Sequence, residues 1–181
     1  MPGTEPTKAP QPSIAWRFAV LLPIAVAFVA ADQLVKVEVR AAEAAGAFPV
    51  ELIRGVIGLT YVENRGAAFG LGDGFGWVFV ALAVVMVVGS AVYLARAPLV
   101  SRLEVVGLAM IAGGAVGNAI DRVAQGFVTD FITFRFFDFP SFNIADIGIT
   151  VGVVIALIGF AVLSPANAAA RSGAGGDACG R

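Results

Sequence analysis

The chain has 181 residues, of which 59% are hydrophobic and only 14% are charged. A soluble domain carries about 25% charged residues, so this composition indicates a membrane protein. The net charge of −1 provides no basic surface for nucleic acid, and the absence of histidine excludes a Ser-His-Asp triad, a Cys-His pair and an HExxH zinc site.

Four apolar stretches reach the roughly 20 residues that a helix needs to cross a bilayer. We expect membrane-spanning helices over about 14–35, 75–95, 103–120 and 147–163. Pro23 lies inside the first stretch, where neighbouring helices can satisfy the carbonyl that it frees. The segment A-F-V-A-A-D resembles a signal-peptide cleavage site. The helical pattern continues through Lys36, however, and this favours an uncleaved span.

The connection over about 37–74 is too long for a turn. Its segments 50–54 and 57–62 are short runs of β-forming residues broken by glycines, a pattern typical of strands. We therefore predict an all-α membrane protein with four transmembrane helices. A small extracytoplasmic β-rich element is expected between the first and second helices.

The two ends of the chain differ in composition from its centre. Residues 1–13 are Pro-rich and residues 166–181 are Gly/Ala-rich, and we expect both segments to be disordered. They flank a four-helix transmembrane domain over residues 14–165. The only cysteine, Cys179, lies in the tail, which excludes an intrachain disulfide and favours an unstructured tail thiol over a reactive one.

Basic residues near the span ends indicate the orientation of a membrane protein. Arg17, Arg96, Arg102 and Arg171 must all share one side if the chain has four spans. The two remaining connections also contain basic residues, mixed with acidic ones, so the charge bias is small. We predict that both termini are cytoplasmic.

Asp32 and Lys36, in D-Q-L-V-K, are four residues apart, so they share a helix face and can pair. One interpretation is a structural ion pair at the end of the first span. The other is a lysine general base that serves a serine nucleophile. Ser90, near the wrong end of the second span, and Ser141, beside a proline in a loop, are poor candidates for that nucleophile.

Two further polar motifs adjoin the spans. E-N-R-G-A-A-F-G, with Asn64 and Gly66, is either a tight turn before the second span or a substrate-contacting loop in which Asn64 bonds backbone. G-G-A-V-G-N-A-I-D-R closes the third span, and its glycines four residues apart permit another helix to approach closely. Asn118, Asp121 and Arg122 in this motif either anchor the helix at the interface or form a supporting shell.

Asp130, in V-T-D-F-I, and Asp146, in F-N-I-A-D-I, lie at the edges of long apolar stretches. An ionised carboxylate there costs about 3 kcal/mol or more unless it is paired or hydrated, so both acids are functional candidates. The phenylalanines between them predict a connection seated in the bilayer surface. Asp146 can alternatively be a helix cap.

Two carboxylates that share a site hold one proton between them. The ionised partner can then take a proton from water while the protonated partner polarises a carbonyl, which is aspartyl peptide hydrolysis. This chemistry needs no metal and no covalent intermediate, so no cofactor is expected. A carboxylate-only site for a hard cation, formed by Asp121, Asp130 and Asp146, is the alternative.

The motifs also match a known family in order and spacing. D-Q-L-V-K, N-R-G-A-A-F-G, G-G-A-V-G-N-A-I-D-R, V-T-D-F-I and F-N-I-A-D resemble those of the bacterial lipoprotein signal peptidases (signal peptidase II) over roughly residues 14–163. The resemblance implies a membrane-embedded aspartic endopeptidase that cuts prolipoproteins immediately before the diacylglyceryl-modified cysteine. It implies that Asp130 and Asp146 are catalytic. It implies supporting or substrate-binding roles for Asp32, Lys36, Asn64, Gly66, Asn118, Asp121, Arg122, Asn143 and Ala145.

The resemblance also implies a location in the bacterial inner membrane, with the active site near the extracytoplasmic face. Its implied partners are diacylglyceryl-modified prolipoproteins and membrane lipid, without nucleic acid, and we expect a monomer. A proton-coupled transporter is the main competing interpretation, because buried acids also serve as proton relays. A transporter would place its acid in the middle of a span, whereas the acids here lie at span ends.

Overall fold

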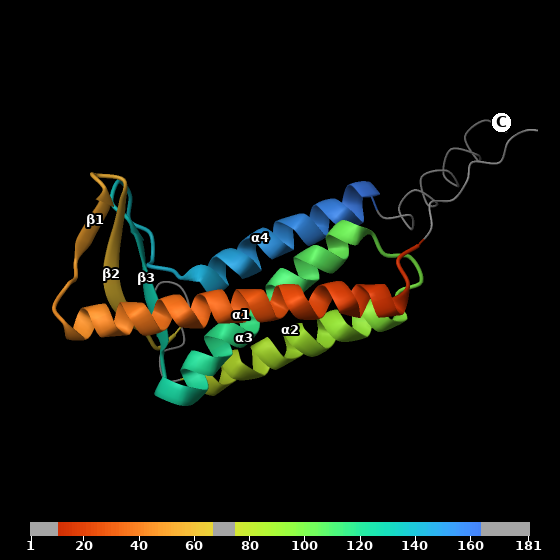
Figure 1. Cartoon of the computed structure of the whole chain (residues 1–181), viewed down its shortest axis with the longest axis horizontal. Coiled ribbons are helices and arrows are strands. Elements are labelled where there is room, and N and C mark those ends of the chain that lie inside the picture. The colour runs from red at the N-terminus through yellow and green to blue at the C-terminus, as the bar shows by residue number, and fades with distance from the viewer. Residues whose placement is uncertain (1–10, 67–74, 164–181) are drawn as a thin grey trace, which may run out of the picture.

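The computed structural model describes residues 11–66 and 75–163 (Figure 1). Most of the expected N-terminal arm, the whole expected tail with Cys179, and the end of the glycine-containing motif at 63–70 lie outside these residues. The described part contains four long helices and a three-stranded antiparallel sheet. This architecture confirms the predicted fold class.

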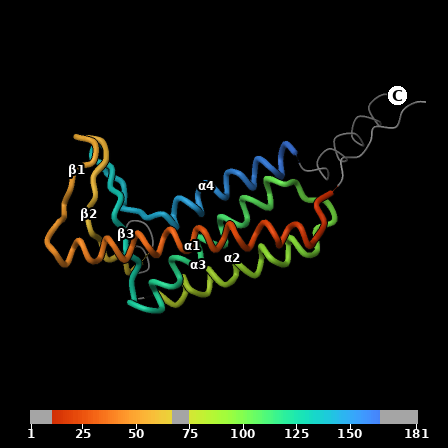
Figure 2. The backbone as a smooth tube through the Cα atoms, viewed as in Figure 1, coloured from red at the N-terminus to blue at the C-terminus, as the bar shows by residue number. Residues whose placement is uncertain are grey.

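The four helices are α1 (Ile14–Ala44), α2 (Gly76–Arg96), α3 (Arg102–Gln125) and α4 (Ile144–Ile158), the last continued by a π-helical turn at Gly159–Leu163. Each is long and apolar enough to cross a membrane. They run side by side along the long axis of the molecule, and the described ends of the chain lie at the end of the bundle away from the sheet (Figures 1 and 2).

Helix α3 lies in contact with the other three helices and has more buried residues than any of them. Its small residues allow this close packing, because a side chain at these positions would strike a neighbouring backbone. A β-carbon on Gly113 would lie 2.7 Å from the carbonyl oxygen of Ala25 in α1, and one on Gly107 would lie 2.5 Å from that of Gly152 in α4. The glycine motif of the third span therefore does bring helices together, as predicted.

The sheet consists of β1 (Val50–Ile53), β2 (Ile57–Asn64) and β3 (Val128–Phe134), in the order β1-β2-β3. The first two strands belong to the predicted element between the first and second spans. The third comes from the connection between α3 and α4, which the sequence analysis treated as an aromatic loop. Strand β3 forms because it pairs with β2, a contact between residues about 70 positions apart that no local pattern reveals.

Two helix ends also differ from expectation. Helix α1 continues to Ala44 instead of ending near residue 35, so the start of the predicted β element is helical. Lys36 and Val39 are buried in this extension, and tertiary contacts therefore hold it. Helix α3 continues to Gln125, where Gly126 ends it in the left-handed conformation at φ 81°.

Close packing of α3 on α4 leads to a stability prediction. We expect Gly107→Ala to lower the free energy of unfolding by about 1–3 kcal/mol, because overpacking forces the helices apart. Gly89→Ala on α2 is the matched control, since nothing lies within 4 Å of its added methyl group. Unfolding in detergent measures both variants, and equal stability for the two would contradict this account of the interface.

Candidate active site

A pocket of ≈ 620 Å³ opens where the helices meet the sheet. Asp130 and Asp146 both line it, so the tertiary structure brings the two predicted acids to one site. Its walls come from α2, α3, α4, the strands β2 and β3, and the connection before α4. The apolar lining consists of Phe79, Leu82, Ala83, Met86, Ala115, Phe134, Phe139, Pro140, Phe142, Ile147, Ile149 and Val151.

Asp130 lies on β3 and is only 2% exposed. Its Oδ1 accepts a hydrogen bond from Asn143 Nδ2 at 2.6 Å, and its Oδ2 accepts one from Asn64 Nδ2 at 2.8 Å. Burial, and secondly the negative charge of Asp146, raise the pKa of Asp130 to about 7, although the two asparagine donors oppose this rise. Asp130 can therefore hold a proton near neutral pH.

Asp146 lies in the first turn of α4 and takes part in a capping box with Asn143. The Asn143 backbone N–H donates to Asp146 Oδ2 at 3.1 Å, and the Asp146 backbone N–H donates to Asn143 Oδ1 at 3.0 Å. Asp146 Oδ1 accepts a further hydrogen bond from Asn118 Nδ2 at 2.7 Å. Asp146 is thus a helix cap that also faces the pocket, and the two interpretations of this residue are compatible.

Two buried amides connect the acids. Asn143 Nδ2 donates to Asp130 Oδ1 and also to Asn118 Oδ1, the latter at 3.1 Å, while Asn118 donates to Asp146. This continuous chain of side chains fixes how the amide groups are oriented, because each amide oxygen faces a donor and each amide nitrogen faces an acceptor. The family resemblance implies a supporting or substrate-binding role for both asparagines, and the structure brings them between the two acids.

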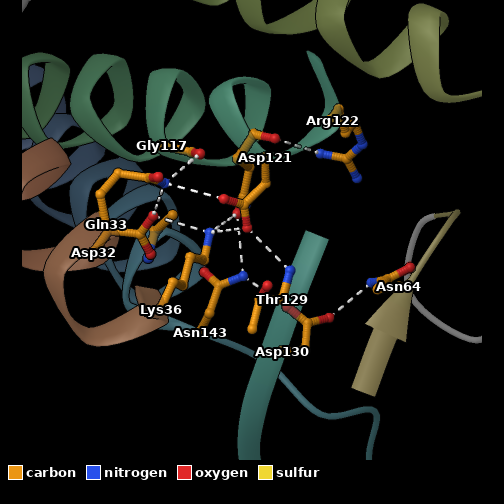
Figure 3. A network of polar contacts seen from close by, with 12 residues as sticks. Asp32, Gln33, Lys36, Asn64, Gly117, Asp121, Arg122, Thr129, Asp130 and Asn143 are labelled. Carbon is orange, nitrogen blue, oxygen red and sulfur yellow. Dashed lines mark hydrogen bonds and ion pairs between the residues drawn. The ribbon is translucent and has the colours of Figure 1, made fainter. Parts of the chain in front are cut away.

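A buried ionic cluster lies behind the pocket (Figure 3). Lys36 is fully buried, and its ammonium lies 2.9 Å from Asp32 Oδ2, 3.2 Å from Asp121 Oδ2 and 2.9 Å from Asn118 Oδ1. Asp32 Oδ1 also accepts the backbone N–H of Ala145 at 2.9 Å. Removing one charge from such a cluster typically costs about 3–5 kcal/mol, because its partners remain buried and unpaired.

These contacts favour the structural interpretation of the Asp32–Lys36 pair. The ammonium of Lys36 faces two carboxylates and an amide, and no described serine contacts it. Ser90 Oγ donates to the Met86 carbonyl at 2.7 Å, and Ser141 Oγ lies 3.0 Å from Thr133 Oγ1. The described residues therefore contain no Ser/Lys catalytic pair.

The loop after β2 contributes a second set of polar contacts. Asn64 Oδ1 accepts the Gly66 backbone N–H at 3.0 Å, so one amide side chain both shapes the turn and contacts Asp130. Arg122 Nη2 donates to the Gly66 carbonyl at 3.0 Å, and its guanidinium lies 4.8 Å from the centre of the Phe79 ring. The buried Arg122 Nε has no hydrogen-bond partner among the described residues, and Arg122 lines the pocket.

Three further residues that the sequence analysis did not identify belong to the network. Gln33 Nε2 lies within 3.2 Å of Asp32 Oδ2, the Gly117 carbonyl and Asp121 Oδ1. Arg40 and Thr129 contact each other at 3.0 Å. The sequence does carry a signal for Arg40, which lies four residues after Lys36 on the same helix face.

The carboxylate-only cation site is not supported in the described part of the chain. No group of three or more Asp, Glu, His or Cys residues there is arranged to hold a metal ion. Asp121 instead contacts Lys36 and accepts the Thr129 backbone N–H at 3.0 Å.

The raised pKa of Asp130 predicts a pH-dependent stability. Because the folded-state pKa of about 7 exceeds the ordinary value, the folded protein binds more protons than the unfolded chain between about pH 4 and 7. Protonated Asp130 therefore adds to the free energy of unfolding. This contribution is fully present below about pH 4 and is lost as the pH rises through about 7. We therefore expect Asp130→Asn to stabilise the protein relative to wild type more at about pH 8 than at about pH 5.

Thermal unfolding in detergent at the two pH values measures this difference. Asp138→Asn, which neutralises an exposed carboxylate on the same connection, controls for the loss of charge. If the stability gained by Asp130→Asn did not grow between about pH 5 and pH 8, this would contradict the conclusion that burial raises the pKa of Asp130.

The chain is similar to known proteins over most of its length. A family model described as signal peptidase (SPase) II matches residues 24–162. The chain is similar to the lipoprotein signal peptidase of Brevibacillus brevis, with 40% identity over 136 residues that cover 75% of this chain and 90% of the relative. It is also similar to that of Geobacillus thermodenitrificans, with 38% identity over 146 residues that cover 79% and 90%.

A solved structure shares the fold as well. It is described as a bacterial membrane enzyme determined by the in meso method at 2.3 Å, and it matches with a TM-score of 0.69 and 30% identity. The match covers 77% of this chain and 86% of the solved chain. With four apolar helices, two acids in one pocket and these similarities over most of its length, the chain belongs to the signal peptidase II family of lipoprotein signal peptidases.

Proposed function

We propose that the chain is an aspartic endopeptidase that cleaves prolipoprotein signal peptides immediately before the diacylglyceryl-modified cysteine. The observation that carries this proposal is that Asp130 and Asp146 line one pocket and are joined through Asn143 and Asn118. Similarity to named lipoprotein signal peptidases supports the substrate class.

In the proposed mechanism the two acids hold one proton. Asp130, whose pKa is raised to about 7, donates it as a hydrogen bond to the scissile carbonyl. The ionised Asp146 takes a proton from water, whose oxygen attacks the carbonyl carbon. Asp146 then transfers that proton to the leaving amine as the carbonyl re-forms and the C–N bond breaks, and Asp130 retains its own proton throughout. No metal and no covalent enzyme intermediate takes part.

The pocket walls are compatible with a substrate that arrives from the bilayer. Leu82 on α2 is 51% exposed, and Ile147 and Val151 on α4 are 39% and 41% exposed, so both walls continue into the outward-facing apolar surface of the helices. A signal peptide held in the membrane could therefore reach the acids without crossing a polar surface. We propose that Arg122 Nε donates to a peptide carbonyl of the bound substrate.

The location of the acids favours hydrolysis over proton-coupled transport. Asp130 lies on a strand outside the spans and Asp146 lies in the first turn of α4, so neither acid lies at the centre of a span. A transport pathway would need protonatable groups that lead across the bilayer.

Substitution of the acids tests the proposal. We expect Asp130→Asn and Asp146→Asn each to lower the turnover of a lipid-modified preprotein by at least about 1,000-fold, because the members of a catalytic unit act together. Both variants should still accumulate and bind substrate. Wild-type turnover should survive exhaustive chelation, since the proposed chemistry uses only carboxylates and water.

Asp121→Asn is the matched control, because Asp121 is also a buried aspartate but contacts Lys36 instead of lining the pocket. We expect it to act mainly by lowering stability. A folded but inactive Asp121→Asn together with an active Asp130→Asn would refute the assignment of Asp130 and Asp146 as the catalytic pair. Loss of turnover on chelation that an added divalent ion restores would indicate a metallohydrolase.

We further propose that both termini are cytoplasmic and that the site lies near the extracytoplasmic face of the inner membrane. The described chain ends lie together at the end of the bundle away from the sheet, and Arg17, Arg96 and Arg102 lie at that end (Figure 1). Reporter fusions after Ser13 and after Pro165 should both give a cytoplasmic signal. An extracytoplasmic signal from either position would overturn this orientation.

A further inference from the structure

Three polar residues of α1 follow one another at intervals of four, and together they contact α4, α3 and β3. Asp32 accepts the backbone N–H of Ala145 in α4 at 2.9 Å. Lys36 contacts Asp121 and Asn118 in α3. Arg40 Nη1 donates to Thr129 Oγ1 in β3 at 3.0 Å. One face of α1 therefore contacts three of the elements that surround the site, namely α4, α3 and β3.

The contacts made by Asp32 and Arg40 share a further property. Each holds the residue that directly precedes one of the two acids. Ala145 precedes Asp146, and Thr129 precedes Asp130. Both anchored residues have no exposed surface. The two anchors are eight residues apart on α1, a distance of about 12 Å along a rigid helix.

Two hydrogen bonds hold Thr129 in place next to Asp130. Its backbone N–H donates to Asp121 Oδ2 at 3.0 Å, and its hydroxyl accepts from Arg40. Because successive side chains of a strand point to opposite faces, the Thr129 side chain reaches α1 while that of Asp130 reaches the pocket (Figure 3). Movement of Thr129 would therefore move Asp130 as well.

We propose that α1 sets the separation of Asp130 and Asp146, and that Arg40 and Thr129 are positioning residues which hold Asp130 at its working distance. The role in catalysis rests on the proposed function. The mechanical part, that the Arg40–Thr129 contact immobilises β3, does not depend on any activity. Neither residue touches the pocket, so each acts through Asp130.

Isosteric substitution of Thr129 separates the hydroxyl from the shape of the side chain. Thr129→Val keeps the branched shape and the backbone N–H but loses the hydroxyl, whereas Thr129→Ser keeps the hydroxyl. We expect Thr129→Val to lower kcat by about 10- to 100-fold with little change in KM, since a small displacement of a reacting group has effects of this size. Thr129→Ser should retain kcat close to that of wild type.

Hydrogen exchange measures the mechanical part in the same samples. We expect the amides of β3 to exchange faster in Thr129→Val than in wild type or Thr129→Ser. Arg40→Met should reproduce both effects and be the more severe variant, because it also removes the ion pair of Arg40 Nη1 with Asp121 Oδ1 at 3.7 Å. The double variant should be no worse than Arg40→Met, because Arg40→Met already breaks the contact that Thr129→Val breaks. Arg54→Met, on the exposed turn between β1 and β2, is the charge-matched control and should leave both measurements unchanged.

The outcomes distinguish the two proposals. Unchanged β3 exchange in Thr129→Val, or equal losses of kcat in Thr129→Val and Thr129→Ser, would overturn the positioning role. Additive losses in the double variant would overturn it too. If wild type itself failed to cleave a lipid-modified preprotein, the proposed function would fail, and the exchange data would still decide whether Arg40 and Thr129 hold β3.

Discussion

The site depends on the two ion pairs and the hydrogen bond that the buried ammonium of Lys36 makes. A charge inside an apolar bundle is costly unless every donor has a partner, and Lys36 has two carboxylates and an amide oxygen within 3.2 Å. Those partners lie on α1 and α3, and they in turn bind α4 and β3 through Ala145 and Thr129. The electrostatic requirement of one lysine thus joins the elements that carry both acids.

Asp130 and Asp146 lie on different secondary-structure elements, which gives them different burial and different hydrogen-bond partners. Asp130 is on a strand, almost fully buried, with its two oxygens held by amide side chains. Asp146 is half-buried at a helix start, where backbone N–H groups are available to a carboxylate. Two carboxylates in unlike environments are suited to unlike roles in acid–base chemistry.

Close packing of small residues makes this arrangement possible. A β-carbon on Gly117 would lie 2.7 Å from Asp32 Oδ2, so the absence of a side chain leaves the space that the carboxylate occupies. Gly113 has the same role toward the backbone of α1. The glycines of α3 therefore do more than join helices, since they also let a charged cluster form inside the bundle.

The sequence by itself determined the four spans, the class of the fold and the two acids, because hydrophobic length and isolated charges are local properties. It also placed Asn118 and Asn143 in the site by motif. Only the tertiary structure decided that β3 joins the sheet, that α1 extends to Ala44, and that Gln33, Arg40 and Thr129 belong to the network. These features depend on pairing between segments far apart in the chain, and the contacts that stabilise them exist only once the helices have packed.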